Sequence, residues 1–187
     1  MLFRSITRAS NNLYSTWYYM REALNAKDAG GILQKSLGSY GVSIDNIRCD
    51  LYEFRKLHNT LSKHCVHVPL YENIARLCSG LYLNGLYYSW AADEQRYFEI
   101  EQEKLMVKLA SLYRESGEAE KALELLNKAI FNCPFSDEVY KEIITLHISS
   151  GNTIAALHHY KKYEESLLSE FGTEPSEQIH SLVEDFL

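Results

Sequence analysis

The sequence lacks the long apolar segments that membrane proteins need. No apolar run approaches the roughly 18 residues required to cross a bilayer, and no secretory signal peptide precedes the rest of the chain. The four cysteines, Cys49, Cys65, Cys78 and Cys133, include no Cys-x-x-Cys pair. We therefore expect free thiols in a reducing cytosol and no membrane partner.

The sequence also lacks the short motifs that carry most enzyme and cofactor chemistry. It contains no GxGxxG, GxxxxGK[ST], GxSxG or HExxH pattern. His64, Cys65 and His67, with His58 six residues before the first of them, form its one compact cluster of metal-type ligands. No second Cys/His pair stands at the spacing of a structural zinc site. The sequence therefore predicts no enzyme, no cofactor and no bound metal.

The net charge of −6 is unevenly distributed along the chain. Residues 1–48 hold six basic and three acidic residues, which gives +3, whereas residues 49–187 hold 13 basic and 22 acidic residues, which gives −9. A basic head on an acidic body indicates that the two segments have different tasks. The alternative is a chance fluctuation within a short segment.

The second half of the chain contains an internal repeat with a period of 34 residues. This is the period of the tetratricopeptide repeat, in which two antiparallel helices form a hairpin. Small residues suit a close helix crossing, glycine suits the end of the first helix, and proline stops the second. The first copy has Ala110, Tyr113, Gly117, Ala122, Leu126, Ala129 and Pro134, which align with Ile144, His147, Gly151, Ala156, Tyr160, Tyr163 and Leu168.

The residues after the second copy predict how the repeats end. Leu168 replaces the terminal proline of the first copy, so we expect this last helix to run on. Gly172 then favours a helix end, and Ser176 favours the start of a short closing helix. The apolar side of that helix would carry Ile179, Leu182, Val183 and Phe186.

The segment upstream of the repeats reads as a further helical hairpin that does not fit the repeat template. Apolar spacing predicts helices over 71–83 and 90–105, joined by a turn at 83–85. Residues 62–70, which contain Pro69, are expected to form a loop.

The N-terminal segment is of a different kind. A helix is expected to begin at Ser10 or Asn11 and to end near Leu24 or Asn25. Gly30 and Gly31 break the chain, and residues 32–35 and 40–44 alternate as two strands around a turn at 37–39. A helix followed by a β-hairpin is the second half of a winged helix; an ordinary helix and hairpin packed on the repeats is the alternative. The apolar stripe of the helix would hold Leu13, Trp17, Met20 and Leu24.

The order of these segments resembles a known family. Residues 8–13 (Arg-Ala-Ser-Asn-Asn-Leu), residues 20–24 (Met-Arg-Glu-Ala-Leu) and the Gly-Ser-Tyr-Gly hairpin at 38–41 resemble the recognition helix and wing of an OmpR-type winged helix. Four later motifs, at 49–54, 80–85 with 88–91, 133–138 and 168–175, are similar to the bacterial transcriptional activator domain of SARP-type regulators.

The resemblance implies both a fold and a function. The fold is mostly α: a partial winged helix over 1–48, followed by a tetratricopeptide-like array of helical hairpins over 49–187. Family members are bacterial transcription regulators whose winged helix binds repeat elements in promoter DNA and whose helical domain assembles the regulator or engages partners; some carry a receiver domain in front. Only about nine residues precede the recognition helix here, where a complete winged helix has two further helices, so the chain is either a shortened gene product or a fragment.

Two sets of candidate binding residues follow. On the N-terminal helix, Asn11, Ser15 and Tyr18 share a face that could reach base edges in a major groove, and basic residues nearby could meet phosphates. The first helix of each repeat would line a concave surface for a protein partner or a second copy. The DNA-binding set is Arg8, Asn11, Ser15, Tyr18, Arg21 and Lys35, and the partner-binding set is Lys104, Val107, Ser111, Arg114, Glu138, Lys141, Thr145 and Ile148.

Three classes of function remain open. The first is a transcription regulator with a DNA-contacting head, and the second is a tetratricopeptide adaptor that binds a protein and no DNA. An enzyme is the third, although no catalytic constellation is visible in the sequence. A DNA affinity that falls steeply with salt would favour the first class over the second.

Overall fold

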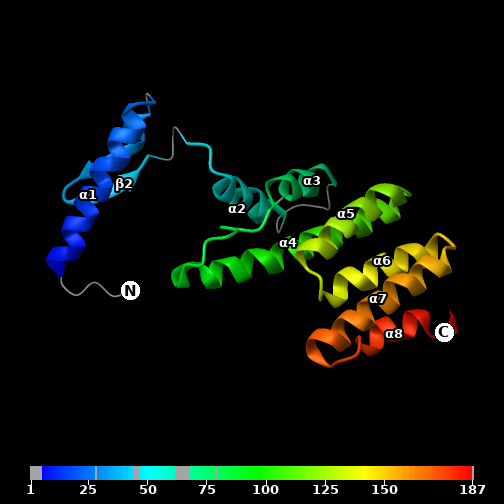
Figure 1. Ribbon diagram of the computed structural model, residues 1–187. Helices are drawn as coiled ribbons and strands as arrows, with labels where there is room; N and C mark the ends of the chain where they lie inside the picture. The colour runs from blue at the N-terminus through cyan, green and yellow to red at the C-terminus, as the bar shows by residue number, and fades with distance from the viewer. Residues whose placement is uncertain (1–5, 28, 44–46, 62–67, 79, 187) are drawn as a thin grey trace. The chain divides into compact units, whose positions relative to one another are not determined.

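The computed structural model describes residues 6–27, 29–43, 47–61, 68–78 and 80–186 (Figure 1). The chain divides into two compact units, Met1–Asp50 and Leu51–Leu187. This division falls two residues after the boundary expected from the sequence.

The first unit is one helix and one β-hairpin, as the sequence predicts. Helix α1 (Ile6–Asn25) is followed by the short 3-10 helix η1 (Gly30–Ile32) and by strands β1 (Leu33–Ser36) and β2 (Ser39–Val42). The strands pair antiparallel, from Leu33 opposite Val42 to Ser36 opposite Ser39. Leu37 and Gly38 form the two-residue turn with φ of 46° and 83°, the left-handed conformation that matches the twist of a tight hairpin.

The start of α1 corrects one sequence expectation. The helix begins at Ile6 and not at Ser10 or Asn11, so neither polar residue caps it. No glycine or proline interrupts residues 6–10, and Arg8 and Ala9 are good helix formers, so the helix gains a further turn. Each strand is also displaced by about one residue from the expected range, and Ile44, at the predicted end of the second strand, lies outside the described residues.

The second unit is a succession of antiparallel helices. It contains α2 (Asp50–Leu61), α3 (Val68–Leu77), α4 (Ala92–Glu115), α5 (Ala119–Asn132), α6 (Asp137–Ser149), α7 (Thr153–Phe171) and α8 (Glu177–Val183), with the 3-10 helices η3 (Ser89–Ala91) and η4 (Glu184–Phe186). The two repeats are the hairpins α4–α5 and α6–α7, and α4 also contacts α6, which in turn contacts α8. The mostly helical fold class is thereby confirmed.

The repeats form as their sequence predicts. Gly117 and Gly151 end the first helix of each hairpin with φ of 77° and 74°, a conformation that costs glycine little. Ala110 and Ala122, predicted at the helix crossing, are fully buried. The last helix runs on to Phe171, and α8 closes the array with Ile179 and Val183 buried.

The hairpin upstream of the repeats differs from the sequence expectation. Helix α3 ends at Leu77 rather than at residue 83, and it begins at Val68, so Pro69 lies in its first turn instead of in a loop. Proline is tolerated there because the first N–H groups of a helix lack an intrahelical partner. The second predicted helix, over 90–105, starts at Ala92 and continues unbroken to Glu115, so α4 is also the first helix of repeat one.

Two glutamines of α4 contact the chain between α3 and η3. The side-chain amide of Gln102, which is buried, donates to the carbonyl of Cys78 at the end of α3. The amide of Gln95 lies 3.3–3.4 Å from the carbonyls of Tyr82, Leu83 and Leu86. The two side chains thereby donate to main-chain carbonyls that lie outside the helices.

The core of this unit has two parts. Four residues, Phe54, Ile74, Phe98 and Leu105, form a cluster where α2, α3 and α4 meet. The larger cluster fills the repeats, and includes Leu126, Ile143 and Ile144 without measurable exposure. Helix α4 contributes to both clusters, and the Tyr113 hydroxyl on this helix donates to Glu72 of α3 at 2.6 Å.

Candidate nucleic-acid interface and protein-binding groove

An aromatic cluster joins α1 to the hairpin in the first unit. The rings of Trp17 and Tyr40 meet edge to face with centroids 4.7 Å apart, and the Tyr14 ring lies 6.0 Å from Tyr40. The Lys35 ammonium stands over the rings of Tyr40 and Tyr14, 5.2 and 5.8 Å from their centroids. Lys35 of the wing is therefore held by cation–π attraction beside the helix.

The candidate DNA-contacting residues of α1 form a continuous stripe. Arg8, Asn11, Ser15 and Tyr18 follow one another at intervals of three or four residues, and all four are exposed. At about 100° per residue they lie within an arc of about 80°. The early start of α1 therefore brings Arg8 into the helix and onto the face of Asn11. Arg21 is also exposed and lies about 60° beyond Tyr18 around the helix, close to the direction of Tyr14.

The apolar stripe of α1 is largely uncovered within its unit. Leu13 and Met20 are 48% and 44% exposed, and Trp17 is half-buried against the hairpin. None of the α1 side chains whose burial the structure describes is buried. The apolar stripe thus remains available to a further surface.

In the second unit, α4 and α6 enclose a shallow hollow of about 370 Å³. Its lining mixes both signs of charge around one apolar side chain, Val107. It brings together four of the predicted partner-binding residues and three that the sequence analysis missed. The predicted ones are Lys104, Val107, Ser111 and Glu138, and the missed ones are Glu103, Lys108 and Glu142. Lys108 and Glu142 each follow a predicted residue by four positions, so a wider helical face would have included them.

The other four predicted partner-binding residues lie outside this lining. The Arg114 Nε donates to Glu142 Oε1 at 2.9 Å and so joins α4 to α6. The Lys141 Nζ donates to Gln178 Oε1 at 3.0 Å and joins α6 to α8. Thr145 is half-buried, and Ile148 packs against the repeat core. None of the eight is buried, so the predicted face remains accessible.

A second hollow, of about 440 Å³, lies on the opposite flank of α4, against α2 and α3. Its apolar lining comes from Leu61, Tyr71 and Leu105, and Lys104 and Lys108 line this hollow as well as the first one. The two lysines therefore stand on a crest of α4 with one hollow on each side. The remaining lining residues are His58, Asn59 and Glu101.

Glu101 pairs with two basic side chains on this side of α4. Its carboxylate lies 2.8 Å from the His58 Nε2 of α2 and 2.8 Å from the Lys104 Nζ. Burial acts to raise the pKa of the Glu101 carboxyl, but the hydrogen bonds and charges of Lys104 and His58 bring it below its ordinary value. The same partnership with Glu101 raises the pKa of Lys104. Lys104 is thus engaged by its own helix.

Across the residues with described positions, no group of three His, Cys, Asp or Glu side chains could hold a metal ion. The cluster of His64, Cys65 and His67 lies outside those residues. None of the described helices is long and apolar enough to cross a membrane.

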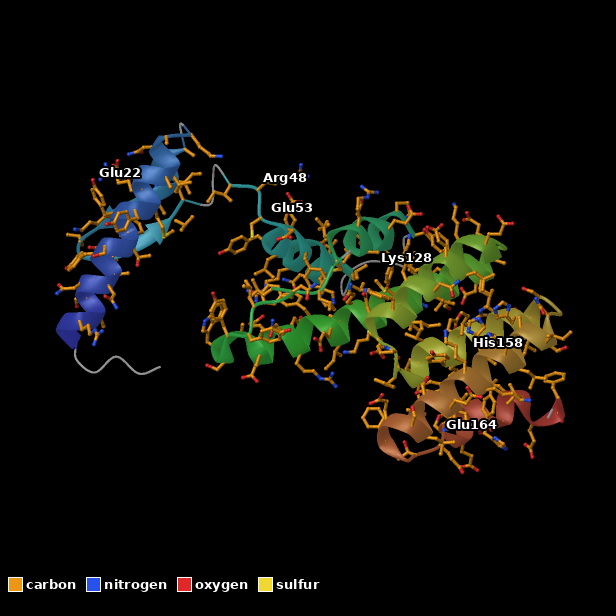
Figure 2. All side chains as sticks on the ribbon, viewed as in Figure 1. Glu22, Arg48, Glu53, Lys128, His158 and Glu164 are labelled. Atoms are coloured by element: carbon orange, nitrogen blue, oxygen red, sulfur yellow. The ribbon has the colours of Figure 1, made fainter. Side chains whose placement is uncertain are left out.

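The side chains of the outer helices provide reference positions away from the groove. Lys128 lies on α5 and His158 on α7 (Figure 2). Lys128 pairs with Glu124 of its own helix at 2.7 Å, and Lys161, also on α7, is exposed. These positions are suitable for control substitutions that change charge without touching the hollows.

Comparison with known proteins gives one family and one fold. Residues 49–187 match the profile of the family described as bacterial transcriptional activator domain. The structure is similar to that of Mycobacterium tuberculosis EmbR in complex with a low affinity phosphopeptide, with a TM-score of 0.63 and 19% sequence identity. The similarity covers 94% of this chain and 49% of the EmbR chain, so the present chain spans about half of that length. No curated protein sequence matches the chain.

Proposed function

Because the chain belongs to the bacterial transcriptional activator domain family, we propose that it is a transcription regulator whose first unit contacts promoter DNA and whose helical unit holds a protein partner. The observation that carries the proposal is the family match over 49–187, preceded by a helix and hairpin with a basic, polar stripe. No receiver domain or signal enters this proposal.

The stripe on α1 supports contact with DNA. A major groove admits an α-helix, and side chains such as Asn11 can pair with base edges there. Arg8 and Arg21 lie on the same helix at positions suited to phosphates on either side. Lys35 rests on the rings of Tyr14 and Tyr40, so the hairpin can present its ammonium group to the DNA backbone.

The helical unit supports a separate role in binding protein. The hollow between α4 and α6 mixes carboxylates and lysines around Val107, a surface better suited to a peptide than to a phosphate backbone. The unit also lies within the acidic part of the chain, which carries −9 and would repel DNA. Its occupant is a partner segment or a second copy of the chain.

The test is a titration of the chain against promoter-length duplex at low and moderate salt. Binding through phosphates should weaken steeply with salt, and each lost contact should reduce the log–log salt slope by about one unit. We expect Arg8→Ala and Arg21→Ala to lower both the affinity and the slope. Lys161→Ala removes the same charge from α7 and should leave both unchanged.

A protein adaptor without DNA binding is the second candidate. It is favoured by the uncovered Leu13 and Met20, which need a further surface. In that case the parent chain and both arginine variants would bind duplex equally and negligibly. The hollow between α4 and α6 would then be the remaining functional surface.

A further inference from the structure

Two lysines of α4 lie on the crest between the two hollows. Lys104 and Lys108 are successive exposed residues on one side of the helix, and both border the two hollows. Lys104 already pairs with Glu101 at 2.8 Å. Within the part of the chain that the structure describes, Lys108 forms no ion pair.

The charged residues around Lys108 differ between the two hollows. Towards α6, the three carboxylates of the first hollow include Glu142, which Arg114 engages at 2.9 Å, and Glu103, which accepts a hydrogen bond from the Ser136 hydroxyl at 2.8 Å. Towards α2 and α3, the lining contains two lysines and a single carboxylate. The second hollow is therefore positively charged, on a body whose net charge is −9.

The shape of the second hollow complements this charge. Leu61, Tyr71 and Leu105 supply an apolar floor next to the Lys108 ammonium. Leu61, Tyr71 and Leu105 also pack in the cluster of Phe54 and Phe98, so the floor is held by the core. An apolar side chain could be buried here while a neighbouring carboxylate stays at the rim.

We propose that Lys108 is the anchoring residue for an acidic, apolar peptide segment of a protein partner: one apolar side chain of the segment enters the hollow of Leu61, Tyr71 and Leu105, and an adjacent carboxylate pairs with Lys108. This inference rests on the proposed protein-binding role of the helical unit and specifies the chemistry of its ligand. The segment continues over the crest towards Val107 in the first hollow.

The experiment uses the full chain and three sets of short synthetic peptides on an array. In each set Leu or Phe alternates with a polar residue, which is Asp or Glu in the first set, Asn or Gln in the second, and Lys or Arg in the third. The first set should bind roughly tenfold more strongly than the second, because the two differ only in charge. Lys108→Glu should abolish this preference, whereas Lys161→Glu, the same change on exposed α7, should retain it.

Two further variants separate the possible failures. Lys108→Gln removes the charge without reversing it and should lose most of the preference, and thermal melting checks that each variant folds. Val107→Gln places a longer, uncharged polar side chain at the apolar centre of the first hollow and measures the contribution of that hollow to binding.

The outcomes then separate the inference from the proposed function. If peptides bind and Val107→Gln weakens their binding, but acidic and amide sets bind equally or Lys108→Glu has no effect, the Lys108 anchor is wrong and the protein-binding role of the first hollow stands. If no set binds the parent chain more strongly than it binds the Val107→Gln variant, the protein-binding role of this surface fails as well.

Discussion

The hydroxyl of Tyr163 on α7 donates a hydrogen bond to Asp137 Oδ1 in the first turn of α6, at 2.5 Å. The Tyr163 ring also stacks on Tyr140, with centroids 4.0 Å apart. The two helices of repeat two are therefore joined by a polar contact next to a buried aromatic pair. Burial, followed by the hydrogen bond to Asp137, raises the pKa of Tyr163 above its usual value, so the hydroxyl remains a donor at neutral pH.

Tyr163→Phe should destabilise the chain by about 1.5–3 kcal/mol, because it leaves the ring in place and removes a hydrogen bond to a charged group. Urea unfolding followed by circular dichroism measures the change in the free energy of unfolding. Tyr87→Phe is the control. Because Tyr87 is 97% exposed, removal of its hydroxyl should change the free energy of unfolding little. Equal midpoints for the two variants would show that the contact with Asp137 contributes nothing.

Ala122→Leu should cost about 1–3 kcal/mol of unfolding free energy through overpacking. Ala122 has no measurable exposure and belongs to the repeat core, so the added atoms must displace neighbours. Thermal unfolding compares this variant with Ala92→Leu, which adds the same atoms at an exposed position in the first turn of α4. A melting temperature of the parent value for Ala122→Leu would contradict the assigned repeat register.

Stability should fall as the pH is lowered from about 7 towards 4, in part because of His159. Burial, and then the charges of His147, His158 and Lys162, lower the pKa of His159 to about 4. Its Nδ1 is buried without a hydrogen-bond partner among the described residues. Between pH 6.5 and 4 the unfolded chain binds a proton at this position that the folded chain does not, so the free energy of unfolding decreases.

His159→Phe should remove about 2 kcal/mol of this pH dependence, a value reduced from the full shift to allow for partial exposure. The Phe ring can keep the stacking that His159 makes with His147, whose ring centroid lies 5.2 Å away. His158→Phe, on the exposed neighbour, should change the slope much less, because the charge of His158 is a smaller cause of the lowered pKa of His159 than burial is. Urea titrations at several pH values provide the comparison, and identical slopes for all three proteins would exclude the role given to His159.

Asn11→Ala should relax sequence preference on DNA, whereas Asn12→Ala should not. Both asparagines are exposed on α1, but Asn12 lies about 100° further around the helix, away from Ser15 and Tyr18. Loss of a bidentate base contact is worth about 1–3 kcal/mol of discrimination. Competition between preferred and scrambled duplexes measures the ratio, and equal ratios for the two variants would remove Asn11 from the reading face.

The sequence predicted those parts of the fold that depend on local signals. Gly117 and Gly151 mark helix ends because few other residues accept a positive φ, and that signal is visible without a structure. The continuity of α4 was missed because its apolar spacing from residue 90 to 105 and the template of repeat one were considered as separate patterns. No glycine or proline lies between Ala92 and Glu115, and this absence predicts one continuous helix.

The candidate binding residues also divide into those that local spacing predicts and those that tertiary contacts bring together. Lys104, Val107, Ser111 and Glu138 follow from helical spacing, and the structure brings them together in one hollow. The second hollow, which Lys108 and Leu105 line, exists only because α2 and α3 pack on α4 through contacts distant in sequence. The carbonyls of Cys78 and Tyr82, beyond the end of α3, likewise accept from Gln102 and Gln95, which no local pattern connects to them.

The unbroken 24 residues of α4 make it a rod of about 36 Å that belongs to two cores at once. Phe98 and Leu105 fix one end in the α2–α3 cluster, and Leu109 and Ala110 fix the next turns in the repeats. A small tilt imposed at one end must therefore appear at the other, because the rod has no joint along its length. A ligand in the second hollow, beside α2, would therefore change the width of the first hollow, between α4 and α6. By thermodynamic reciprocity, a ligand in the first hollow would change the affinity of the second hollow for its own ligand.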